Sequence, residues 1–176
     1  MLTLKDQAAK LLKFTPYVEM HGKDPVPGSA LRIEFNVEST ALSGFDPELR
    51  AFLYRKLGAK THDLADQSAE LPDLRFQKIK PPYTYRQRYN ESTLTIHIGD
   101  RTDNAIVLAG SVKKPFALTP MQGGTCVIGM TYHCHPSSDE IGTIYDLQRN
   151  DIRISFDPGE EVDDDDEDDG DEGGEE

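Results

Sequence analysis

"LRIEFNVES", residues 31–39, alternates apolar and polar side chains without interruption. Apolar residues hold every odd position from Leu31 to Val37, and charged or amide residues hold the positions between them. A period of two places the two sets on opposite faces of a β-strand. The stretch therefore predicts a strand with one face in the core and the other facing solvent.

Similar patterns recur along the chain. The segments that predict further strands are "TLTIHI" (93–98), "AIVLAGSV" (105–112), "TCVIGMTYHCH" (125–135) and "DIRISF" (151–156). Because residues 105–112 are apolar on both faces, we expect them to lie centrally in a sheet. In 125–135 the even-numbered residues from Cys126 to Cys134 share the apolar face, which predicts two core thiols.

Three segments predict short helices. In "GFDPELRAFLYRKLG" (44–58), Asp46 can cap amide donors and Gly58 can end the helix in a left-handed conformation. The expected core stripe of this helix is Leu49, Phe52, Leu53 and Leu57. The second prediction is an amphipathic N-terminal helix, from the spacing of Leu4, Ala8, Leu11 and Leu12. The third is a helix that begins with a capping box of Ser137 and Glu140.

Strand segments that follow one another in sequence favour antiparallel pairing. Turn-forming residues at 21–29 and 99–104 separate the predicted elements. The predicted fold class is α+β and β-dominated: an antiparallel sheet or partly open barrel of about six strands, with two or three short helices.

Charge divides the chain into two parts. Residues 157–176 contain 14 acidic side chains and no basic one, whereas residues 1–156 contain 19 basic and 18 acidic side chains. A segment of such charge cannot bury enough apolar surface to offset its ordering entropy. We therefore predict a single β-rich domain over 1–156 and a disordered acidic C-terminal tail over 157–176.

Cysteine usage and hydropathy bear on the compartment. The chain has two cysteines, too few for a disulfide framework, which favours a reducing environment. The N-terminal residues lack the apolar region of a signal peptide, and the longest apolar run is too short to cross a membrane. We expect a cytoplasmic protein with no membrane partner.

Residues 75–89, "RFQKIKPPYTYRQRY", have five basic and four aromatic side chains and no carboxylate. Single-stranded nucleic acid is bound by cations that follow the phosphates and by aromatic faces that stack on bases. The segment predicts a nucleic-acid site with the cations Arg75, Lys78, Lys80, Arg86 and Arg88 and the stacking residues Phe76, Tyr83, Tyr85 and Tyr89.

A structural interpretation of the same residues stays open. A regular strand over 83–89 would turn its tyrosines towards the core and its arginines towards solvent, as many half-buried strands do. The pair Pro81–Pro82 would instead interrupt the strand and leave part of the segment as a basic loop.

The tail contains an uninterrupted acidic run, Asp163, Asp164, Asp165, Asp166, Glu167, Asp168 and Asp169. We expect this polyanion to compete with nucleic acid for the basic surface and to recruit basic protein partners. Such competition weakens with salt, because the Debye length is only about 8 Å at physiological ionic strength. The plainer interpretation is a solvated appendage that keeps the protein soluble.

Catalytic signatures do not appear. The sequence has no GxSxG, GxxxxGK[ST], GxGxxG or HExxH motif, so an enzyme is the weaker expectation, with no catalytic residue and no cofactor to name. His133 and His135 share a strand face, as two metal ligands would, but His97 is the only candidate for a third ligand. We therefore predict no metal site.

Several segments occur in a recognisable order. They are "HGKDPVPGSALRIEF" with "FDPELRAFLY", then "LPDLRFQKIKPP" with "TLTIHIG", and last His135–Pro136 before a helix and a final strand. In this order the chain resembles small proteins encoded by tailed bacteriophages, over most of residues 14–156. The resemblance implies a role during infection, in the cytoplasm of a bacterial host, and assigns no site residue.

The layout of a β-rich body with an acidic tail is similar to that of single-stranded DNA-binding proteins of bacteria and phages. In that family the tail recruits replication or repair partners and competes with DNA. Those tails usually end in an aromatic residue, whereas this sequence ends "DEGGEE". The departure puts recruitment through a hydrophobic terminal anchor in doubt.

Three functional hypotheses follow from the sequence. The favoured one is a non-enzymatic nucleic-acid-binding protein that prefers single-stranded DNA and whose tail tunes affinity. The second is a protein-interaction or inhibitor module whose tail mimics DNA. The third is a virion or assembly component, for which a homo-oligomer is expected.

Overall fold

The computed structural model describes residues 2–55, 73–98 and 105–162, and these are dominated by β-structure. The strands are β1 (Leu4–His21), β2 (Asp24–Glu38), β3 (Tyr54–Arg55), β4 (Asp73–Leu74), β5 (Tyr83–Tyr85), β6 (Arg88–His97), β7 (Ala105–Val112), β8 (Phe116–Pro120), β9 (Thr125–Cys134), β10 (Asp151–Asp157) and β11 (Glu160–Val162). The helices are the 3₁₀-helix η1 (Ser39–Gly44), α1 (Leu49–Leu53) and α2 (Ser138–Asp146).

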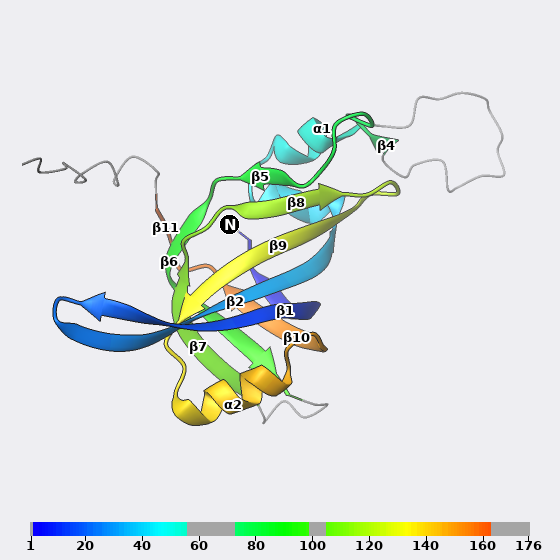
Figure 1. The fold of residues 1–176 in the computed structure, drawn as a ribbon. Helices are drawn as coiled ribbons and strands as arrows, with labels where there is room; N and C mark the ends of the chain where they lie inside the picture. The colour runs from blue at the N-terminus through cyan, green and yellow to red at the C-terminus, as the bar shows by residue number, and fades with distance from the viewer. Residues whose placement is uncertain (1, 56–72, 99–104, 163–176) are drawn as a thin grey trace, which may run out of the picture.

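Six of these strands form a ring. Following the hydrogen-bonded pairs gives the order β6, β10, β1, β2, β9, β7 and back to β6, and every pair is antiparallel. Strands β8 and β5 continue the sheet from β9, and β11 continues it from β6 (Figure 1). The prediction of a β-dominated antiparallel sheet with a few short helices is therefore confirmed, with a partly ring-like sheet.

The ring closes through one short contact between β7 and β9. This contact pairs Gly110 with Cys134 and Ser111 with His133. A Cβ atom on Gly110 would collide with the backbone carbonyl oxygen of His133 and would lie 3.0 Å from the Tyr132 ring. Glycine is thus required where the two strands cross most closely.

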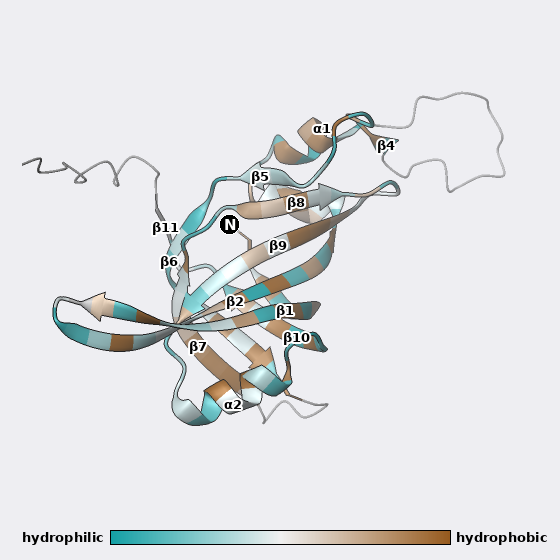
Figure 2. Cartoon of the chain, viewed as in Figure 1, coloured by the Kyte–Doolittle hydropathy of each residue, from teal (hydrophilic) through white to brown (hydrophobic). Residues whose placement is uncertain are grey.

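The interior of the ring holds the core. The odd-numbered residues from Leu31 to Val37 and the even-numbered residues from Cys126 to Cys134 are buried, as their alternation predicts. Tyr132 is fully buried, and its hydroxyl lies 2.8 Å from the carbonyl oxygens of Ser92 and Leu108. Figure 2 shows the matching alternation of hydrophobic and hydrophilic residues along β2 and β10.

Strand β7 has neighbours on both edges, as expected for a central strand, but its two faces differ. Its inward residues Ile106, Leu108 and Val112 are buried, while Val107 on the outward face is 61% exposed. The outward face remains apolar even though the described residues place no layer over it. The predicted central position is therefore confirmed, although only one face of the strand is buried.

The predicted N-terminal helix is wrong, because residues 4–21 form strand β1. Register shifts occur between Leu4 and Gln7 and between Leu11 and Lys13. Each bulge inserts an extra residue and breaks the period of two. The buried positions then fall at irregular spacings that resemble the repeat of a helix.

Strands β1 and β2 extend beyond the ring as a two-stranded arm, residues 16–28. Among the described residues, this part of each strand pairs only with the other (Figure 1). Gly22, with φ +67°, takes the first central position of the two-residue turn, as a type II′ hairpin requires. The turn predicted over 21–29 is therefore confined to two residues, and the rest of that segment is strand.

The two faces of the arm differ in composition. The residues that continue the inward face of the ring are all apolar and exposed: Pro16, Val18, Met20, Pro25 and Pro27. The opposite face carries Tyr17 and Glu19, which turn towards β9 and its neighbours.

The helices are short. Helix α1 covers only part of the predicted 44–58, and Leu57 and Gly58 lie outside the described residues. Asp46 accepts a hydrogen bond from the Glu48 amide at 2.6 Å, while Phe52 of the expected core stripe is 53% exposed. The capping box of Ser137 and Glu140 is confirmed at the start of α2.

None of the described helices has the length and apolar character that crossing a membrane requires.

The folded body continues past the predicted boundary at residue 156. Strand β11 pairs with β6, with Glu160 opposite Asn90 and Val162 opposite Arg88. Gly159, with φ +64°, permits the turn that brings β11 back, and a Cβ there would approach the Asn90 carbonyl oxygen to 2.5 Å. Asp157 and Glu160–Val162 are therefore part of the sheet, and residues 163–176 of the predicted tail, which include the acidic run 163–169, lie outside the described residues.

Candidate functional site

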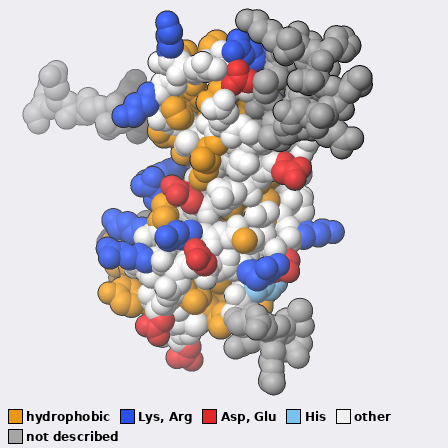
Figure 3. Space-filling model, turned by 90° about the vertical axis from the view of Figure 1, so that its right-hand side faces the viewer, with side chains coloured by type: hydrophobic (Ala, Val, Ile, Leu, Met, Phe, Trp, Pro, Cys, Tyr) orange, Lys and Arg blue, Asp and Glu red, His pale blue; other side chains and the backbone are white. Residues whose placement is uncertain are grey.

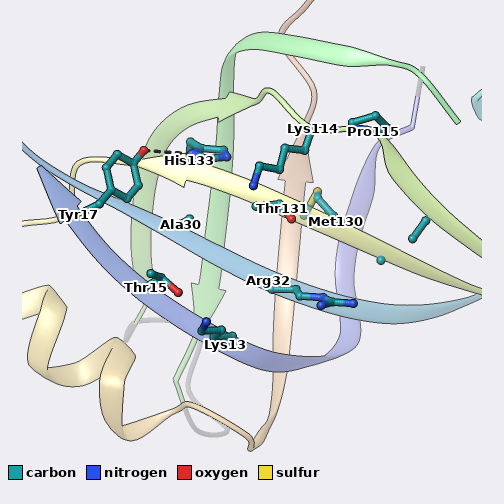
Figure 4. Close-up of a pocket in the computed structure, with 12 residues that line it drawn as sticks. Lys13, Thr15, Tyr17, Ala30, Arg32, Lys114, Pro115, Met130, Thr131 and His133 are labelled. Atoms are coloured by element: carbon teal, nitrogen blue, oxygen red, sulfur yellow. Dashed lines mark hydrogen bonds between the residues drawn. The ribbon is translucent and has the colours of Figure 1, made fainter. Parts of the chain in front are cut away.

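An open groove of about 680 Å³ lies on the outer face of the sheet, where β1, β2 and β9 run side by side. Lys114 and Pro115, on the segment before β8, form one of its walls (Figure 4). Register aligns the lining side chains in rows across the strands. The two rows that cross the groove are Lys13–Arg32–Thr131 and Thr15–Ala30–His133.

Small side chains create the hollow. Ala30, Ala117 and Gly129 all line the groove, and a Cβ on Gly129 would lie only 3.3 Å from the Cβ of Ala117. Longer side chains, among them Tyr17 and Lys114, stand around this floor. The groove is thus a trough in the sheet surface, with a floor close to the backbone.

Three cationic side chains line the groove: Lys13, Arg32 and Lys114. Lys13 and Arg32 are direct cross-strand neighbours, so their like charges repel each other. Within the described residues none of the three forms a salt bridge, and no carboxylate is among the described lining residues. The nearest carboxylate along β2 belongs to Glu34, opposite Gly129. The cations are therefore available to an anionic ligand.

One end of the groove holds a chain of three hydrogen-bonded side chains. The Tyr17 hydroxyl lies 3.0 Å from His133 Nδ1 (Figure 4). The same hydroxyl lies 3.0 Å from Glu19 Oε1. Gly28 leaves room for the Tyr17 ring, since a Cβ there would come within 2.8 Å of it. Glu19 also contacts His135 Nε2 at 3.1 Å, so this carboxylate joins the arm to the end of β9.

Burial and neighbouring charges fix the protonation of this chain. Desolvation lowers the pKa of His133, Lys113 and Lys114 lower it further, and Glu19 opposes them. Burial, together with the contact to Glu19, raises the pKa of Tyr17 to about 12. At neutral pH the imidazole is therefore uncharged and the phenol keeps its proton.

The cations predicted as a nucleic-acid site lie along the segment from β4 over β5 to β6 (Figure 1). Lys78, Lys80 and Arg86 are exposed, and Arg88 is half-buried in β6. Arg75 is exposed but held in place, since its guanidinium donates to the Ala51 carbonyl oxygen at 2.9 Å. These cations are spread along the segment, and none of them lines the groove.

The aromatic side chains of this segment pack inwards. Tyr89 is fully buried, which corrects its assignment as a stacking residue. Tyr83 and Tyr85 are half-buried, and their hydroxyls donate to the carbonyl oxygens of Ile79 and Phe45, each at 3.3 Å. The Phe76 ring packs on Phe52 with centroids 5.4 Å apart. The inward tyrosines match the orientation expected of a half-buried strand, but the strand predicted over 83–89 is interrupted between β5, which ends at Tyr85, and β6, which begins at Arg88.

The histidines and cysteines have other environments. His133 and His135 bond to Tyr17 and Glu19, and His97 bonds to Ser155. Among the described residues no cluster of three or more His, Cys, Asp or Glu side chains is arranged to hold a metal ion. Cys126 and Cys134 are buried, and desolvation raises the pKa of each thiol to about 12, which makes them unreactive core residues.

The groove was missed by sequence reasoning for a specific reason. The alternation of 31–39 places Arg32 on the outward face, but the helix predicted at the N-terminus hid its strand neighbour Lys13. Lys114 stands next to Lys113 in a short polar break between two strands, which is no signal by itself.

Figure 3 shows that Lys and Arg side chains gather on the left of the view at mid-height, with fewer Asp and Glu side chains among them.

Comparison of the chain with protein-family models, with curated proteins and with solved structures gave no match.

Proposed function

We propose that this chain is a non-enzymatic nucleic-acid-binding protein that holds single-stranded DNA in the groove across β1, β2 and β9. The observation that carries the proposal is the set of three cations, Lys13, Arg32 and Lys114, in a trough with no carboxylate among its described lining residues. A cationic groove that follows the backbone is the common feature of proteins that bind single strands.

The phosphates of the strand would neutralise the cationic row. A phosphate between Lys13 and Arg32 removes the repulsion between these neighbours, so binding relieves an unfavourable contact of the free protein. The small residues of the floor let the strand approach the sheet closely. Tyr17 and His133 then offer polar ring edges to groups that only an unpaired base exposes.

The predicted basic segment contributes a second, adjacent surface. Thr84 of β5 pairs with Ala117 of β8, and Ala117 lines the groove. The exposed cations Lys80 and Arg86 flank β5 along the chain, where a longer strand leaving the groove could meet them. In this proposal the segment assists binding through its charge, without base stacking by Tyr89.

The acidic tail regulates the same surface. Its charge, opposite to that of the groove, supports competition with DNA and recruitment of basic proteins. The setting proposed with it is the bacterial cytoplasm during phage infection, on the resemblance described above. The tail also motivates the second candidate, a DNA-mimicking inhibitor, in which the tail is the binding element.

Fluorescence anisotropy of a labelled oligo(dT) of about twelve nucleotides, titrated across salt, tests the proposal. Lys13→Ala with Arg32→Ala should weaken binding at least tenfold at low salt. It should also reduce the slope of log K against log salt by about 0.7 for each phosphate that the variant no longer neutralises. The matched control is Lys5→Ala with Lys23→Ala, since both lysines are exposed and neither lines the groove.

Equal losses of affinity in the two double variants would show that general charge, and not the groove, binds the strand. Absence of binding at low salt would overturn the proposal. In that case the inhibitor candidate predicts that a partner protein binds the full chain and is released when residues 163–176 are removed.

A further inference from the structure

His133 has one ring nitrogen engaged and the other without a partner. Nδ1 lies 3.0 Å from the Tyr17 hydroxyl, whereas Nε2 is buried and has no hydrogen-bond partner among the described residues. A buried polar atom without a hydrogen-bond partner destabilises the protein. A ligand group that bonds to this atom therefore contributes more to the binding free energy than a bond to an atom that water already satisfies. The ring belongs to the lining of the groove.

The hydrogen-bond chain determines which nitrogen carries the proton. Tyr17 has a single hydroxyl proton, and the Glu19 carboxylate, at 3.0 Å, can only accept it. The Tyr17 oxygen must therefore accept from His133, which places the imidazole proton on Nδ1. A neutral imidazole with hydrogen on Nδ1 presents a lone pair at Nε2. Lowering of the His133 pKa by burial and by Lys113 and Lys114 agrees with the neutral form.

Because Nε2 can only accept, it selects among the parts of a nucleic acid. A phosphodiester carries no proton at neutral pH and cannot donate to it. The Watson–Crick edge of every base carries an N–H group, and this edge is free in a single strand. Resting on the function proposed above, we infer that His133 Nε2 is the base-reading atom of the groove and accepts a hydrogen bond from a nucleobase N–H.

The rest of the groove is consistent with this division of roles. Lys13 and Arg32 take the phosphates, two residues along each strand from the row that contains His133. Nε2 is covered in the free protein, so an exposed lining side chain moves when a base enters. Figure 4 places Lys114 beside the His133 ring and across β9, where the approach of a phosphate would draw its ammonium away.

The test is ¹⁵N NMR of the imidazole nitrogens in the full-length protein, with the His133 signals assigned by their loss in His133→Gln. The free protein should show the neutral form with hydrogen on Nδ1. At saturation with oligo(dA), oligo(dC) or oligo(dT), the Nε2 resonance should move upfield for at least one of them. Methylating the Watson–Crick N–H of that base, as in N3-methylthymine, should abolish the shift and weaken binding about threefold to tenfold.

Three outcomes with DNA or with the free protein would overturn the inference. They are an Nε2 resonance that bound DNA leaves unchanged, the same shift with abasic DNA, and a free protein with hydrogen on Nε2. An RNA strand that shifts Nε2 when its DNA counterpart does not would assign the donor to the ribose 2′-hydroxyl and also overturn it. Failure of the proposed function is separate, because anisotropy would then show no binding by any oligonucleotide.

Discussion

Gly110 shows how much of this fold depends on a single missing side chain. It lies where β7 reaches β9 and closes the ring, directly against the His133 carbonyl and the Tyr132 ring. Gly110→Ala should lower the free energy of unfolding by about 1–3 kcal/mol, because a methyl group forced into a packed site shifts the backbone around it. Chemical denaturation monitored by circular dichroism measures the change.

Gly142 provides the matched control for that substitution. It lies in helix α2 with no atom within 4 Å of the position of a Cβ. Gly142→Ala should leave stability unchanged or raise it by up to about 1 kcal/mol, since alanine restricts the unfolded chain more than glycine does. A loss of stability at Gly110 no larger than the change at Gly142 would contradict the role of Gly110 in closure.

Some residues of the site were accessible to sequence reasoning and others were not. Alternation correctly placed Arg32 and His133 on outward faces, because that inference needs only the period of one strand. The pairing of Arg32 with Lys13 depends on register, and two bulges in β1 obscure that register in the sequence. Tyr89 was misjudged because composition shows that a segment is basic and aromatic but not which way each ring points.

Among the elements, α2 is the one whose start is encoded most locally. Ser137 accepts from the Glu140 amide, and the Glu140 carboxylate accepts from the Ser137 amide at 2.7 Å. Ser137→Ala should lower the free energy of unfolding by about 0.5–2 kcal/mol, because an amide donor of the first turn loses its partner. The control is Ser138→Ala, one residue into the helix and exposed. Equal effects of the two substitutions in denaturation experiments would argue against the capping box.

The elements that were predicted well share a short-range signal. The capping box and the clean alternation of 31–39 and 125–134 depend on residues within a few positions of each other. The arm and β11 had no such signal. Residues 24–28 contain two prolines and a glycine, which in the sequence are typical of a turn, and they form a strand because β1 pairs with them. Strand β11 pairs with β6 because the chain turns back at Gly159.

At the scale of the whole molecule, the separation of charge between body and tail makes a prediction. Changing the acidic residues of 163–169 to their amides keeps chain length and β11 but removes the negative charge. This variant should bind oligo(dT) more tightly than the unchanged protein at low salt, and the difference should vanish in high salt as charges are screened. Anisotropy across salt measures both, and weaker binding by the amide variant would contradict competition.

The fold class followed from the sequence, which left an open antiparallel sheet and a partly open barrel as alternatives, but the choice between these two did not. Alternation and short connections are enough to indicate an antiparallel β-dominated domain. Closure depends on which distant edges meet, and here β7 meets β9 over only two residue pairs. The groove depends on the same long-range arrangement, since its lining residues come from β1, β2, β9 and the segment before β8.

The arm also affects how one copy of the protein meets another. A ribbon that projects from a domain exposes backbone amides along its rim, and a neighbouring chain can use them to add a strand. Pro25 and Pro27 occupy alternate positions on the β2 rim, where a residue with an amide hydrogen would point it outwards, and Pro16 does the same on the β1 rim. The β2 rim of the arm therefore offers no outward amide donor between residues 24 and 28. The hairpin can therefore project from the body with one apolar face exposed, while the prolines prevent a strand of another copy from pairing with its β2 rim.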